Sequence, residues 1–152
     1  MNNSRTPVWD VLASKAEAQA RQARFRYDNA ISRKEQAIAR DQKVDHMLVE
    51  YAEKLNEIQR KSHSTTEAAN FRQFLVQLQG IKADSSRELA LYQHDCDAAA
   101  KILQLAEQER QKYEQLAERA KQKQRTLFAH RETKETEVQS MMQFNLKSRS
   151  HY

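Results

Sequence analysis

Residues 61–67 read KSHSTTE, and this polar stretch decides the fold because it separates two long helical patterns. Within it, Ser64 is followed three residues later by Glu67, which is the spacing of a capping box at the start of a helix. A short turn between two long amphipathic helices brings them together antiparallel. We therefore predict an all-α fold, a long antiparallel two-helix coiled-coil hairpin, with its turn at about residues 61–66.

The stretch before the turn has the pattern of one long helix over about residues 7–60. Thr6 can cap this helix, and Pro7 fits its first turn, where a backbone N–H has no helical partner to lose. Apolar residues then recur in alternating steps of four and three, which is typical of a coiled coil. Only Lys34 and Asp41 interrupt this row with polar side chains. The row, which we call the first seam, consists of Trp9, Ala13, Ala16, Ala20, Ala23, Tyr27, Ala30, Lys34, Ala37, Asp41, Val44, Leu48, Tyr51, Leu55 and Ile58.

The stretch after the turn predicts a longer helix over about residues 67–144, followed by a flexible tail at residues 146–152. The same steps recur along it in a second seam, formed by Leu89, Tyr92, Cys96, Ala99, Leu103, Ala106, Arg110, Tyr113, Ala117 and Ala120. The two arms are therefore unequal within a single hairpin domain spanning residues 1–152.

Residues 121–149, which we call the overhang, have no counterpart in the first helix. They carry seven Lys or Arg and three Asp or Glu, a local net charge of 7 − 3 = +4. A lone helix cannot bury apolar side chains, so those of the overhang imply a partner or fraying. These side chains are Leu127, Phe128, Val138, Met141, Met142 and Phe144.

Bulky apolar residues are concentrated beside the turn, where residues 70–84 read NFRQFLVQLQGIKAD. The seams near the termini are rich in alanine instead, so we expect a thin hairpin there and a thick one near the turn. Gly80 is the only glycine of the chain and lies inside this bulky stretch. A local bend or a close approach of the helices at Gly80 is our hypothesis.

The composition argues against an enzyme. The chain of 152 residues has one Gly and one Pro, too few for a fold with many turns or for a phosphate-binding loop. Its single cysteine, Cys96, excludes an intrachain disulfide and fits a reducing compartment. No histidine pair has the spacing of a metal site, and no apolar run predicts a signal peptide or a membrane span. We predict no cofactor, no metal and no small-molecule substrate.

The net charge of +5 leaves two other classes of protein open. One is a basic nucleic-acid-binding coiled coil, for which residues 21–27 are the best local candidate because three arginines flank Phe25 there. The other is a homodimeric structural coiled coil, in which each long helix pairs with another chain. A modest charge excess on solvated helix faces explains the same composition without any anionic partner.

Four stretches resemble the flagellar FliJ family, the stalk proteins of the type III flagellar export ATPase. They are LASKAEAQARQA at 12–23, DHMLVEY at 45–51, NFRQFLVQL at 70–78 and ERQKYEQLAERAKQKQR at 109–125. The third is similar to the family's signature at the start of the second helix, although Ile81 comes one place early. The resemblance covers nearly the whole chain and implies a non-enzymatic antiparallel coiled coil. It also implies a cytoplasmic protein that associates peripherally with the inner membrane.

The resemblance further implies partners, namely the export ATPase hexamer, the membrane export gate and the flagellar export chaperones, with no nucleic acid. Carried onto this sequence, the face that docks on the gate consists of Val44, Leu48, Tyr51, Leu55, Phe74, Leu78 and Ile81. The contact with the ATPase ring, at the ends that carry the termini, consists of Trp9, Leu12, Lys121, Lys123, Arg125, Leu127, Phe128 and Arg131. The gate-docking residues are also of the type that a coiled-coil seam requires, so a purely structural role for them stays open.

Overall fold

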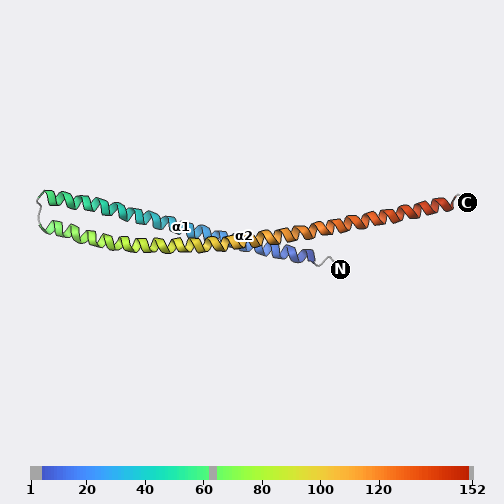
Figure 1. Cartoon of the computed structure of the whole chain (residues 1–152), viewed down its shortest axis with the longest axis horizontal. Coiled ribbons are helices and arrows are strands. Elements are labelled where there is room, and N and C mark those ends of the chain that lie inside the picture. Colours follow the sequence, from blue (N-terminus) through green and yellow to red (C-terminus); the bar gives the residue numbers. More distant parts are fainter. Residues whose placement is uncertain (1–4, 62–64, 151–152) are drawn as a thin grey trace. The chain divides into compact units, whose positions relative to one another are not determined.

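The computed structural model of the chain describes residues 5–61 and 65–150, which form two α-helices. Helix α1 runs from Arg5 to Arg60 and α2 from Thr65 to Arg149 (Figure 1). The all-α prediction and the unequal lengths of the two arms are confirmed, since α1 has 56 residues and α2 has 85. Good helix formers occupy most positions of both helices, and the only proline lies in the first turn of α1.

The helix ends differ from the predicted ones by a few residues. Helix α1 already includes Thr6, which was predicted to cap it, and α2 includes residues 146–149, which were predicted to form a flexible tail. The turn remains near its predicted place, and the Lys61 N–H still bonds the Glu57 carbonyl at 3.1 Å. Ser64 of the predicted capping box lies outside the described residues, as do residues 1–4, 62–63 and 151–152.

The chain divides into two compact units. The turn unit comprises residues 21–105, and the terminal unit comprises residues 1–20 with 106–152. Within the turn unit, α1 and α2 run antiparallel, because Arg40 pairs with Glu88 at 3.0 Å whereas Asp45, further along α1, pairs with the earlier Lys82 of α2 at 2.8 Å. Within the terminal unit, Lys121 lies 3.7 Å from Asp10 across the two helices.

The core of each unit is the seam. Every position of the first seam is buried or half-buried, and so is every position of the second seam, which confirms the predicted four-three pattern. The most buried side chains are mainly small: Ala16, Ala20, Ala23, Ala37, Leu78, Cys96 and Ala117. Small side chains let two helix backbones approach closely, so much of the hairpin is held by thin, close packing.

The second seam continues toward the turn beyond its predicted start. Stepping back from Leu89, the same alternation reaches Ser85, Lys82, Leu78, Leu75 and Phe71, all of which are buried or half-buried. The hydrogen bond from Ser85 to Asp41 fixes the register of the two seams. The numbers of two seam residues that face each other across the helices therefore add up to about 126. This register places Leu78 level with Leu48.

Gly80 does not mark a close approach of the helices. It is exposed, and a methyl group added at its Cα would meet no heavy atom within 4 Å. The hypothesis of close packing at Gly80 is therefore wrong. The glycine remains a position of lower helix propensity on the solvent side of α2.

Candidate functional site

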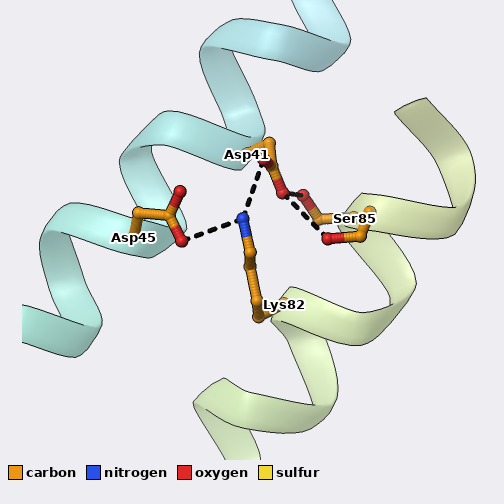
Figure 2. A network of polar contacts seen from close by, with 5 residues as sticks. Asp41, Asp45, Lys82 and Ser85 are labelled. Carbon is orange, nitrogen blue, oxygen red and sulfur yellow. Dashed lines mark hydrogen bonds and ion pairs between the residues drawn. The ribbon is translucent and has the colours of Figure 1, made fainter. Parts of the chain in front are cut away.

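A polar layer interrupts the apolar seam in the middle of the turn unit. Lys82 of α2 reaches between two carboxylates of α1, with its Nζ 2.8 Å from Asp41 Oδ2 and 2.8 Å from Asp45 Oδ1. Ser85 donates its hydroxyl to Asp41 Oδ1 at 2.7 Å, and Ser86 donates to the same oxygen at 3.4 Å (Figure 2). Asp41, which interrupts the apolar row in the sequence, thus accepts hydrogen bonds from three side chains of α2.

Both helices contribute charged groups to the layer, and the pKa values of Asp41 and Lys82 are shifted as a result. The hydrogen bond from Lys82, followed by that from Ser85, lowers the pKa of Asp41 below its ordinary value. The bonds to Asp41 and Asp45 raise the pKa of Lys82. Each shift favours the charged form, because the partner charges and hydrogen bonds outweigh the loss of hydration.

A pH titration should detect this layer. Because its pKa is lowered on folding, Asp41 stabilises the folded state above its unfolded pKa, and this stabilisation is lost as the pH falls through its folded pKa. We expect the melting temperature of the wild type to fall more steeply than that of Asp41→Asn between about pH 5 and about pH 3. Thermal unfolding followed by circular dichroism measures both slopes.

The control for this titration is Asp28→Asn, since Asp28 is exposed on α1 and forms no ion pair among the described residues. Its slope should match that of the wild type. Parallel curves for the wild type and Asp41→Asn would show that the carboxylate of Asp41 adds no pH-dependent stability.

A cluster of aromatic rings lies at the turn end of the turn unit. The ring of Tyr51 on α1 stacks obliquely on two rings of α2, with centroids 4.6 Å from Phe74 and 6.1 Å from Phe71. Lys54 holds its ammonium 5.1 Å from the Tyr51 ring centroid, within the range of a cation–π contact. These three rings and Asn70 line an open apolar depression of about 200 Å³.

The seven residues predicted to dock on the gate all lie in the turn unit but differ in exposure. Five of them are seam positions, and Leu78 is only 3% exposed, whereas Val44, Leu48, Tyr51 and Leu55 are half-buried. Phe74 and Ile81 flank the seam on one edge of α2, and Ile81 is 51% exposed. The edge formed by Phe74, Ile81 and the aromatic depression is therefore the accessible part of this set.

The residues predicted to contact the ATPase ring lie in the terminal unit. Trp9 and Leu12 of α1 are half-buried, while every residue from 121 to 149 is exposed. The six predicted residues of the overhang are therefore all exposed, namely Lys121, Lys123, Arg125, Leu127, Phe128 and Arg131. A single cross-helix ion pair, between Lys121 and Asp10, is found at the start of the overhang in the described residues.

Arg110 is the one charged residue of the predicted second seam, and two neighbouring carboxylates hold its side chain. Its guanidinium bonds Glu107 at 2.8 Å and Glu114 at 2.9 Å along α2. The bond to Glu107 contributes most to raising the pKa of Arg110, and the charge of Glu17 on α1 adds to it. A seam arginine is thus held by carboxylates, as a half-buried charge requires.

Two features of the turn unit were missed in the sequence. The seam position of Lys82 could have been found by stepping back from Leu89 in fours and threes. A second row of exposed apolar residues on α2, at Leu91, Ile102 and Leu105, could have been found from its own spacing. Among residues 5–61 and 65–150, no group of His, Cys, Asp and Glu is placed to hold a metal ion. In that part of the chain, neither helix contains a stretch apolar enough to cross a membrane.

The two long antiparallel helices, with an alanine-rich seam, an apolar turn end and an exposed basic overhang, define a coiled-coil hairpin protein. The sequence matches the family model described as "Flagellar FliJ protein" over residues 10–149. The chain therefore belongs to the FliJ family, whose members are structural components of the flagellar type III export apparatus. Searches among curated proteins and among solved structures gave no match.

Proposed function

We propose that this chain is a stalk and adaptor that couples the export ATPase ring to the membrane export gate and assists the handling of export chaperones. The overhang is the observation that carries this proposal. Every side chain from Lys121 to Arg149 is exposed, and these side chains include both basic and apolar ones. A helix that packs against no other helix cannot bury its apolar side chains, so they indicate a binding partner. A hexameric ring supplies a surface that can cover such a helix on several sides.

The terminal unit fits a narrow opening because its seam is built from alanine. Ala16, Ala20 and Ala117 are among the most buried residues, so the two helices pack closely at this point. The basic overhang favours an acidic lining in the ring, since complementary charge accelerates association and fixes orientation. In this proposal, Trp9 and Leu12 contact the ring beside residues 121–131.

The turn unit supplies the contact with the gate. The aromatic depression at Tyr51, Asn70, Phe71 and Phe74 and the neighbouring Ile81 present an apolar surface that is typical of a protein-binding site. The seam residues of the predicted set hold this surface in place from below. The protein would then act in the cytoplasm, held at the inner membrane through the gate.

The gate contact is tested with the variant Phe74→Ala together with Ile81→Ala. Both side chains flank the seam, so we expect gate affinity to fall about tenfold or more while the helical content is kept. Surface plasmon resonance with the purified gate protein measures the affinity. The matched control is Val49→Ala, an exposed apolar residue of the same unit, which should bind like the wild type. Equal binding by the double variant would remove this face from the proposal.

A further inference from the structure

Helix α2 carries a second apolar row in the turn unit, on the side away from the seam. Leu91, Ala98 and Leu105 are spaced seven residues apart, and Ile102 lies between the last two. We call these four residues the outer stripe. Leu91 is 66% exposed, Ile102 is 53% exposed and Leu105 is 63% exposed, and Ala98 is exposed as well.

The outer stripe has the geometry of a helix-binding surface. Leu91, Ala98 and Leu105 each follow a seam position, Leu89, Cys96 and Leu103, by two residues, which corresponds to a rotation of roughly 200° about the helix axis. Ile102 directly precedes Leu103 and lies on the edge of the stripe nearest to α1. The stripe's steps of seven, four and three repeat the spacing with which one helix receives the side chains of another. It extends for about 21 Å along α2. A partner can occupy it without opening the hairpin.

Positive charge flanks the stripe along the edge that α1 forms. The ion pair of Arg40 with Glu88 fixes the register on this edge. One heptad further, Arg33 comes level with Asp95, and two heptads further, Arg26 comes level with Ile102. Arg26 and Arg33 are exposed, and neither has an ion-pair partner among the described residues.

The other side of the stripe is basic too. Lys101 precedes Ile102 and is exposed, with no ion-pair partner in the described part of the chain. His94 lies on the same side of α2 as Lys101, one heptad before it. Cations therefore border the apolar stripe on both sides, and the two carboxylates within its span, Asp95 and Asp97, are exposed and form no ion pair among the described residues.

We propose that the outer stripe binds an amphipathic helix of a partner protein whose flanks are acidic. Carboxylates on the two flanks of such a helix would meet Arg26 and Arg33 on one side and Lys101 on the other. A second copy of this chain fits less well, because the basic border would face a basic border. An anionic lipid surface fits less well because it would draw the carboxylate of Asp95 toward the hydrocarbon. This surface is separate from the faces proposed for the gate and for the ATPase ring.

The proposal is tested with two synthetic peptides of about three heptads each. Both carry leucine at the apolar positions; one carries glutamate on its flanks and the other carries lysine at the same places. Fluorescence anisotropy with the full chain at low salt measures binding. We expect the glutamate peptide to bind and the lysine peptide to bind at least about tenfold more weakly.

Two variants locate the binding. Ile102→Ser with Leu105→Ser should weaken the glutamate peptide by about tenfold or more, and Arg33→Glu should narrow or reverse the preference between the peptides. The matched control, Val138→Ser with Phe144→Ser, removes two exposed apolar residues of the overhang and should bind like the wild type. Because all of these side chains are exposed, circular dichroism should show unchanged helix content in every variant.

Three results would overturn the proposal. The first is a glutamate peptide that does not bind, or one that binds no better than the lysine peptide. The second is binding to vesicles of anionic lipid that depends on Ile102 and Leu105. The third is a dimer in light scattering that the same double variant dissociates, which would assign the outer stripe to a second copy of the chain.

Discussion

Replacing Leu78 with alanine is expected to lower the free energy of unfolding by about 3 kcal/mol. Leu78 is 3% exposed and, in the part of the chain that the structure describes, is the only large aliphatic side chain among the most buried residues. Leu78 lies level with Leu48 in the bulky part of the seam near the turn, so its truncation leaves a cavity between large side chains that two helices can close only in part. Urea unfolding followed by circular dichroism measures the difference between variant and wild type.

Val76→Ala is the matched control for Leu78→Ala. Val76 lies two residues earlier on the exposed side of α2, and alanine is a better helix former than valine. Its stability should stay within about 0.5 kcal/mol of the wild type. If Leu78→Ala were as stable as this control but failed to bind the gate, Leu78 would belong to a docking surface instead of the seam.

Reversing the charge of Lys123, Arg125 and Arg131 to glutamate is expected to abolish the effect of the chain on the ATPase. All three side chains are exposed on the overhang, so their replacement leaves both seams intact. Under the proposed function, the acidic lining that the wild type enters would now repel the overhang, and affinity should fall by about tenfold or more. Ring assembly and ATP hydrolysis by the purified ATPase, with and without the chain, measure this effect.

The control for this variant carries the same change of net charge elsewhere. Arg24, Lys43 and Arg72 are exposed residues of the turn unit, and their replacement by glutamate should leave ring assembly unchanged. Equal losses in both triple variants would indicate a response to net charge alone. No effect of the wild-type chain on assembly or hydrolysis would contradict the role of a stalk.

Most of the fold follows from the sequence because a coiled-coil seam repeats with a fixed period. The alternation of four and three marked each buried position of α1 and also the half-buried polar positions Lys34 and Asp41, since the period is set by helix geometry and not by hydrophobicity. The turn was equally readable, because no apolar row crosses residues 61–67.

Residues 71–82 were harder to assign because they contain two competing apolar rows. Phe71, Leu75 and Leu78 belong to the seam, whereas Phe74 and Ile81 lie on its edge. Hydrophobicity alone would choose Ile81 over its neighbour Lys82 for the seam. Only the pairing of Lys82 with Asp41 across the helices decides between the two rows.

Binding surfaces were less predictable than the seam for a physical reason. The apolar period of a sequence indicates which residues pack against another part of the same chain. The residues of a docking face depend instead on the shape and charge of a partner molecule, which the sequence does not contain. The outer stripe has the same kind of spacing as a seam over only two heptads, so it stands out once the true seam has been assigned and its exposure is known.

The polar layer has a mechanical consequence. If α2 slid along α1 by one heptad in one direction, Lys82 would come level with Lys34 and Ala37, and two like charges would meet in a half-buried place. Sliding in the other direction would place the ammonium beside the apolar seam residues Leu48 and Tyr51 in place of Asp41. Both displacements break the bonds to Asp41 and leave charges unpaired. The layer therefore acts against shear, so that an axial load applied to one helix of the turn unit is carried by both.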